Sequence, residues 1–105
     1  MNINSVSPSF TGFVTAHAVG DEKKHFINTS RIVGIDSVDL PAWEKKVNTL
    51  KYYNDKNELV TIKSEHPYSE IEDYGEVPTG DDFVNIVSEV CAEADKTGKI
   101  LSILV

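Results

Sequence analysis

The sequence predicts an α+β protein in which a small, curled antiparallel β-sheet of about four to six strands, resembling half of a barrel, is covered by one amphipathic helix. Two observations lead to this class. Short β-favouring runs alternate with turn residues between residues 13 and 64. One apolar stripe of helical period then follows between residues 79 and 96, and an apolar run at residues 99–105 adds a final strand.

The clearest single element is a β-hairpin at residues 51–64. Its two β-rich runs flank Asn54, Asp55, Lys56 and Asn57, which favour turns or tolerate a positive φ. Another hairpin is expected upstream, where residues 13–19 form a strand with Val14, Ala16 and Ala18 on one face. A polar loop then leads to a returning strand at residues 25–27.

This returning strand is interrupted at residues 28–31 and resumes at Ile32. So short an interruption predicts a bend or a bulge, and Gly34 predicts a further kink. A strand that bends in this way lets a small sheet curl over on itself. A loop or one helical turn is expected at residues 41–46, followed by a strand from Val47.

We expect the hairpin's second strand to end at residues 65–67, because Pro67 lacks the backbone donor that a strand ladder needs. A turn or short helix should follow at residues 68–73. In the main helix, Thr79 is placed to cap the first turn and Gly98 to end the last. Its predicted buried stripe consists of Phe83, Ile86, Val87, Val90, Cys91 and Ala94.

Length and composition limit the function classes. A chain of 105 residues is expected to form one domain, here residues 13–105 after a flexible arm at residues 1–12. Its 17 acidic and 10 basic residues give a net charge of −7, which disfavours nucleic-acid binding. The start of the chain lacks the features of a secretory signal, and no apolar run is long enough to span a membrane, so we expect a cytoplasmic protein.

No nucleotide-binding, calcium-binding or nucleophile motif occurs, so the sequence predicts neither a cofactor nor catalytic residues. His17 and His25 flank the first hairpin and are the weak candidates for metal ligands, since one register would set them cross-strand. A slip of one residue would place them on opposite faces. Cys91 falls on the apolar helix face and is expected to be a small buried hydrophobe.

Residues 26–35, 49–53 and 59–64 together resemble the pattern of the small flagellar FlbD/SwrD-type proteins and of similar short bacterial and phage β proteins. In those proteins a strand, its continuation and a hairpin form a small sheet that a helix follows. The resemblance covers about 40 residues. It implies a non-enzymatic module, because that family has no catalytic residues to carry over.

Two main function classes remain. The first is a protein-interaction or assembly module that contacts another protein, or a second copy through an edge strand. Its predicted interaction surface consists of Trp43, Tyr52, Tyr53, Tyr68 and Tyr74. The second is a small-ligand or metal-binding protein or an enzyme, whose site only folding assembles. A third reading, an acidic inhibitor or nucleic-acid mimic, requires the carboxylates to line one contiguous face.

Overall fold

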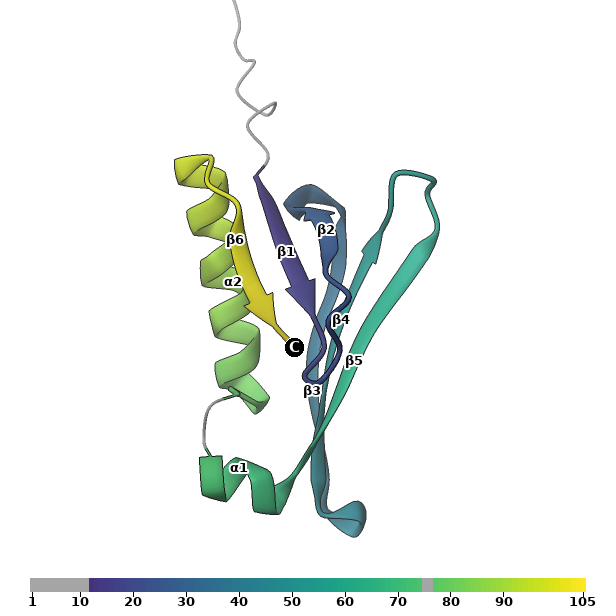
Figure 1. Ribbon diagram of the computed structural model, residues 1–105, viewed down its shortest axis with the longest axis vertical. Coiled ribbons are helices and arrows are strands. Elements are labelled where there is room, and N and C mark those ends of the chain that lie inside the picture. Colours follow the sequence, from purple (N-terminus) through teal and green to yellow (C-terminus); the bar gives the residue numbers. More distant parts are fainter. Residues whose placement is uncertain (1–11, 75–76) are drawn as a thin grey trace, which may run out of the picture.

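The computed structural model describes residues 12–74 and 77–105, so residues 1–11 of the predicted arm lie outside the described residues. The chain folds into six strands, two α-helices and two short 3₁₀ helices within these ranges (Figure 1). The strands are β1 (Phe13–His17), β2 (His25–Asn28), β3 (Ile32–Leu40), β4 (Lys45–Tyr53), β5 (Leu59–Pro67) and β6 (Leu101–Leu104). The helices are α1 (Tyr68–Tyr74), α2 (Gly80–Thr97), η2 (Thr29–Arg31) and η3 (Pro41–Trp43).

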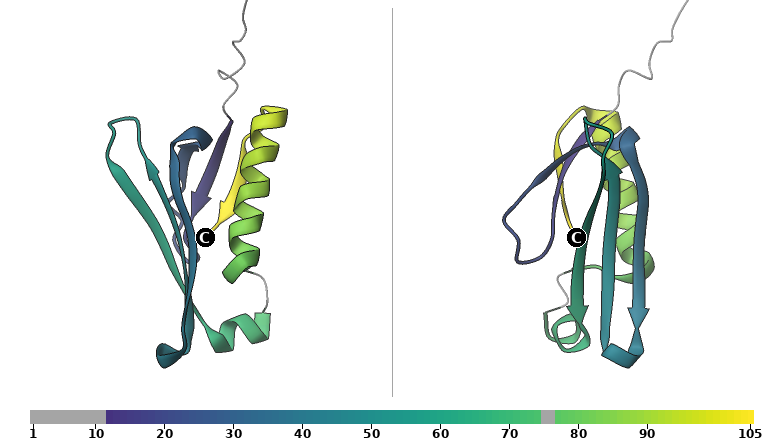
Figure 2. Two further views of the ribbon diagram at one scale, coloured as in Figure 1. Left: turned by 180° about the vertical axis from the view of Figure 1, so that it is seen from behind. Right: turned by 90° about the vertical axis from the view of Figure 1, so that its right-hand side faces the viewer.

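The strands form two three-stranded sheets, which confirms the predicted α+β class and its small curled sheet with one main helix. Sheet I has the order β2-β1-β6 and sheet II the order β3-β4-β5. Neighbouring strands are antiparallel except for β1 and β6, which run parallel. The two sheets face each other across a shared core, and α2 packs against both of them (Figure 2).

The chain passes from one sheet to the other at the predicted interruption. Residues of η2 form a 3₁₀ turn there, and the Asn28 side chain accepts a hydrogen bond from Ser30 N at 3.0 Å. The predicted kink near Gly34 is a β-bulge, because the register shifts between Ile32 and Gly34 and leaves Val33 as the extra residue. These two features turn β3 away from sheet I, and this turn produces the curl.

One hydrophobic core lies between the two sheets and α2. The strand faces alternate as expected, with Val14 and Ala16 fully buried. The core residues are Val14, Ala16, Ile27, Leu50, Tyr52, Ile62, Phe83, Val87, Ala94, Ile103 and Val105. The helix stripe needs one correction: Ile86 is 43% exposed, because it lies at the edge of the stripe.

A buried polar cluster fastens α2 and the end of β6 to sheet II. The Asn48 side chain is fully buried, donating to Pro78 O at 2.9 Å and to Val105 O at 3.1 Å. Its amide oxygen accepts a hydrogen bond from Ser37 Oγ, and His66 Nε2 lies 2.9 Å from Val105 O. Each of these buried polar groups therefore has a partner, as stability requires.

One predicted strand end is confirmed and one predicted helix cap is not. The strand β5 ends at Pro67, within the predicted residues 65–67, and Pro67 still pairs with Lys45, because an edge strand tolerates a proline whose missing N–H would face away from the sheet. Thr79 occupies the N-cap position of α2, yet its side chain makes no capping bond. Ser37 Oγ accepts the hydrogen bond from Gly80 N at 2.6 Å instead, so tertiary contact replaces the local cap.

Candidate functional site

The free edge of β6 is one of the two edges of sheet I in the described chain, the other being that of β2. Within sheet I, β6 pairs only with β1, and no backbone hydrogen bond between described residues joins its other side to another segment. Natural edge strands are usually guarded by charged residues, proline or shortness. The β5 edge of sheet II has such guards in Lys63, Glu65 and Pro67. The edge strand β6 has no charge and no proline, and its length of four residues is its only guard of this kind.

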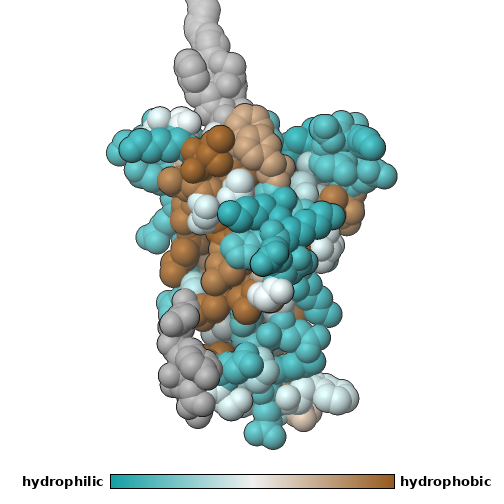
Figure 3. Space-filling model, in the orientation of Figure 1, coloured by the Kyte–Doolittle hydropathy of each residue, from teal (hydrophilic) through white to brown (hydrophobic). Residues whose placement is uncertain are grey.

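The outer face of sheet I carries no Asp, Glu, Lys or Arg in its three strands, and its apolar side chains share it with the polar side chains of Thr15, His17, Asn28 and Ser102. Phe13 and Phe26 stack there with ring centroids 4.9 Å apart, and Phe26 is 58% exposed. Ile100, directly before β6, is also 58% exposed, and Leu104 is partly exposed. Large exposed apolar patches typically mark interaction surfaces. Figure 3 shows apolar side chains gathered over β6, β1 and the adjoining side of α2, with hydrophilic residues around them.

The outer face of sheet II offers a contrast. Exposed Val33 and Val38 line a shallow groove of about 680 Å³, but the same groove includes Asp36, Lys51 and Lys63. A mixed apolar and charged strand face of this kind is the ordinary solvent side of an antiparallel sheet. The charge-free outer face of sheet I is therefore the more unusual of the two.

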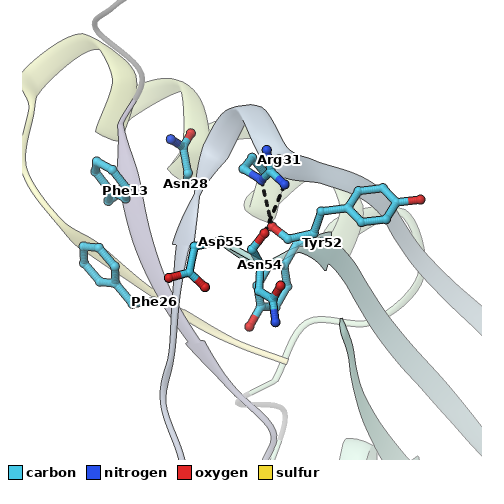
Figure 4. A pocket seen from close by; sticks show the side chains of 8 residues that line it. Phe13, Phe26, Asn28, Arg31, Tyr52, Asn54 and Asp55 are labelled. Atoms are coloured by element: carbon cyan, nitrogen blue, oxygen red, sulfur yellow. Dashed lines mark hydrogen bonds between the residues drawn. The ribbon is translucent and has the colours of Figure 1, made fainter. Parts of the chain in front are cut away.

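A cleft of about 450 Å³ opens where the β4–β5 hairpin diverges from sheet I (Figure 4). Its lining residues are Phe13, Phe26, Asn28, Arg31, Tyr52, Tyr53, Asn54 and Asp55. Arg31 donates from Nε to Tyr53 O at 3.1 Å and from Nη2 to Asn54 O at 3.0 Å, and it also binds the Asn57 side chain. Its guanidinium therefore holds the hairpin in place, and this role accounts for a charged residue in the cleft.

The aromatic residues predicted to form one interaction surface lie in different places. Trp43 is 72% exposed in η3, at one end of β4, whereas Tyr53 lies at the opposite end of that nine-residue strand. Tyr68 begins α1, and its hydroxyl donates to Asp39, which raises the pKa of the phenol. The side chain of Tyr74 lies outside the described part of the chain.

Tyr52 requires a correction, because it is only 6% exposed and points into the core. Its position on β4 matches that of Leu50, two residues earlier on the same inward face. The Tyr52 hydroxyl lies 2.9 Å from His25 Nδ1, which satisfies the polar tip of the ring. An exposed interaction role does not fit this position.

The two candidate metal ligands do not converge. In the observed register Ala16 pairs with His25, so the His25 side chain shares the buried face of sheet I with Ala16. His17 is the next residue along β1 and therefore points to the outer face. This separation contradicts the register in which the histidines would share a metal ion. Among the described residues no group of three or more His, Cys, Asp or Glu side chains could hold one.

Burial is the main cause of the pKa shifts of His25, Tyr52 and Cys91. Desolvation lowers the pKa of His25, with a smaller contribution in the same direction from Lys23, while Asp21 opposes both. Burial, followed by the nearby Asp95 charge, raises the pKa of the Cys91 thiol, which disfavours the reactive thiolate. Burial also raises the pKa of Tyr52.

The surface residues that sequence reasoning did not single out are Phe13, Phe26, Ile100 and Leu104. A signal was present, because both faces of residues 13–19 are partly apolar and both faces of residues 99–105 are mostly apolar. A strand with apolar residues on both faces can be buried on both faces, or it can leave one apolar face exposed to solvent. Only the strand order shows that one face of sheet I has no covering layer among the described elements.

Comparison of the chain with models of known protein families, with curated protein sequences and with solved structures finds no match. The resemblance to the FlbD/SwrD-type proteins therefore stays a prediction. None of the helices in the described ranges has both the length and the apolar character needed to cross a membrane.

Proposed function

We propose that this chain is a non-enzymatic protein-interaction module whose contact surface is the outer face of sheet I together with the free edge of β6. The surface combines two properties that binding surfaces use. Exposed apolar side chains lose contact with water when a partner covers them. An unpaired strand edge supplies backbone donors and acceptors for a partner strand.

The observation that carries the proposal is the absence of charge on this surface in a chain of net charge −7. Charged residues keep exposed sheets soluble and guard their edges. The nine-residue strands β3, β4 and β5 each carry at least two charged residues. The shorter strands β1, β2 and β6 have no Asp, Glu, Lys or Arg. Phe13 and Phe26 add an exposed aromatic stack to this surface.

The small-ligand alternative is supported by the cleft beside the β4–β5 hairpin, whose volume of about 450 Å³ suits a small molecule. Its polar groups are largely engaged in the hairpin itself. Arg31 binds two backbone carbonyl groups there, and Asn54 Oδ1 accepts from the Lys56 and Glu58 backbone N–H groups. Few convergent polar groups remain to orient a ligand, so the interaction module is the better supported function.

Site-specific photo-crosslinking in the cells that express the chain tests this proposal. Benzoylphenylalanine would replace Phe26 or Leu104 on the proposed surface, Trp43 in the aromatic set predicted from the sequence, or Leu59 as a control. Leu59 is a matched control, because it is an exposed apolar strand residue on the other sheet. We expect one discrete adduct from Phe26 and Leu104 and none from Leu59. No adduct from either sheet I position, or equal adducts from all positions, would refute the proposal.

A further inference from the structure

We propose that the free edge of β6 receives an extended segment of a partner protein in which aliphatic and basic side chains alternate. This inference rests on the proposed function and gives the chemistry of the partner. The juxtaposition that carries it is an unpaired, uncharged strand edge lying beside an acidic flank of α2. Strand addition to an exposed edge is a recurring mode of peptide recognition, in which backbone bonds give affinity and side-chain pockets give specificity.

The orientation of α2 follows from Asp95. Its carboxylate accepts hydrogen bonds from Gly12 N at 2.7 Å and from Thr29 Oγ1 at 2.6 Å, so this flank of the helix faces η2 and the start of β3. Ile86 precedes Asp95 by nine residues, which is about two and a half helical turns, and so lies on the opposite flank. The helix α2 packs against β3 and β6 and runs beside β6 in Figure 1. The flank that carries Ile86 is therefore the one on the β6 side.

The flank beside β6 is acidic around an exposed apolar centre. Asp82 lies four residues before Ile86, Glu89 lies three residues after it, and Glu93 lies four residues after Glu89. Side chains at these spacings are neighbours on a helix surface. All three carboxylates are exposed, and none of them forms an ion pair within the described part of the chain. The flank therefore carries exposed negative charge both before and after Ile86 along the helix axis.

An added strand would meet different surfaces on its two faces, because successive side chains point in opposite directions. Side chains on the outer face would lie beside Ile100 and Leu104, which favours aliphatic residues. Those on the inner face would lie over Ile86 and reach the carboxylates. Lysine and arginine suit this position, since their aliphatic stems cover apolar surface while their charged ends stay in water beside the acids.

A second copy of this chain fits the same edge poorly. Its own β6 supplies no basic side chain, and pairing two copies would bring two acidic flanks together. A basic partner segment avoids both conflicts.

Binding of synthetic peptides to the full chain tests the inference. The probe is a fluorescently labelled, capped eight-residue peptide of alternating valine and lysine, and its control alternates valine and glutamate. We expect saturable fluorescence anisotropy with the lysine peptide, at an affinity that falls as salt is raised, and none with the glutamate peptide. Equal binding of both peptides, or of neither, would overturn the inference.

Variants of α2 locate the site. Neutralising the flank by Glu89→Gln or Glu93→Gln should weaken binding of the lysine peptide by roughly two- to fivefold each, as expected for exposed ion pairs. Asp81→Asn is the matched control, because Asp81 is exposed on the same helix about 140° around the axis from Ile86. It should leave the affinity unchanged. Equal losses in all three variants would indicate a general charge effect and refute the proposed site.

Backbone methylation of the peptide tests strand addition itself. A strand directs alternate N–H groups to opposite sides, so methylating either all valine or all lysine nitrogens removes only one set. Only one of the two methylated peptides should lose binding. If both bind unchanged, the segment does not pair with β6.

The photo-crosslinking from Phe26 and Leu104 separates this inference from the proposed function. An adduct with a different protein, together with failure of the lysine peptide, overturns the inference alone. An adduct with twice the mass of the chain makes a second copy the partner and also overturns it. Absence of adducts from both positions refutes the proposed function as well.

Discussion

Replacing Gly12 by alanine should destabilise the fold, because Gly12 is the point where the chain before β1 contacts the end of α2. A Cβ atom added there would lie 2.6 Å from Ala94 C and 2.7 Å from both Ala94 O and Asp95 N. All three are backbone atoms inside a helix, so no flexible side chain can move to relieve the overlap. Movement of Gly12 would instead disturb its 2.7 Å hydrogen bond to the Asp95 carboxylate.

The magnitude follows from these contacts. Overpacking of a close contact costs about 1–3 kcal/mol, and a hydrogen bond to a charged group is worth about 1.5–3 kcal/mol when it is lost. Alanine also restricts the unfolded chain, which offsets about 0.4–1 kcal/mol. We therefore expect Gly12→Ala to lower the free energy of unfolding by about 1.5–5.5 kcal/mol. For a domain of this size each kcal/mol lowers the melting temperature by about 4–8 °C.

Urea and thermal unfolding followed by far-ultraviolet circular dichroism would measure this change. Trp43 fluorescence is a poor probe, since the indole is largely exposed in the folded chain. Gly34→Ala is the control, because its added Cβ would meet only the Lys51 side chain, at 3.6 Å or more, which is ordinary van der Waals contact. The reasoning is refuted if the melting temperatures of the two variants agree within about 2 °C.

Three further predictions test the core and the buried polar groups. Phe83→Ala should lower the free energy of unfolding by about 3–5 kcal/mol, and Ile86→Ala by less than about 1 kcal/mol. Similar urea midpoints for these two variants would contradict the burial of Phe83 and the exposure of Ile86 on α2. Asn48→Ala should cost about 2–4 kcal/mol by the same assay, since it leaves several buried polar groups unpaired, and a neutral result would contradict the cluster. The depressed pKa of His25 means that the unfolded chain binds its proton more readily. Stability should therefore fall as pH drops below the ordinary value of 6.5 toward the folded pKa, and His25→Gln should reduce that dependence of melting temperature; an unchanged dependence would exclude His25 as its source.

Local chemistry explains which elements could be predicted. The hairpin turn was predicted because asparagine supports it in two ways: Asn57 adopts a positive φ, and the Asn54 side chain accepts from two backbone N–H groups. The end of α2 could be predicted for the same reason, because it depends on neighbouring residues: Gly98 adopts a left-handed conformation and its N–H binds Ala94 O. Bonds between residues close in sequence require no knowledge of the remaining fold.

Long-range pairing explains the failures. Ile86 shares the helical period of the buried stripe, but how far burial extends around α2 depends on where the sheets lie. The predicted cap at Thr79 was displaced by Ser37, a residue 43 positions away from the Gly80 N–H that it binds. Tyr52 was assigned to the surface because its alternation on β4 does not say which face is inside.

The sequence by itself determined the strands, the helix and the turns between them, because periodicity, glycine and asparagine act over a few residues. The tertiary structure alone decided that the final strand joins β1 in parallel, with Val14 opposite Leu101. That pairing leaves one edge of β6 open and one face of sheet I uncovered, and it sets both beside the acidic flank of α2. The physical reason is that strand order depends on the free energy of the whole core, which no local pattern records.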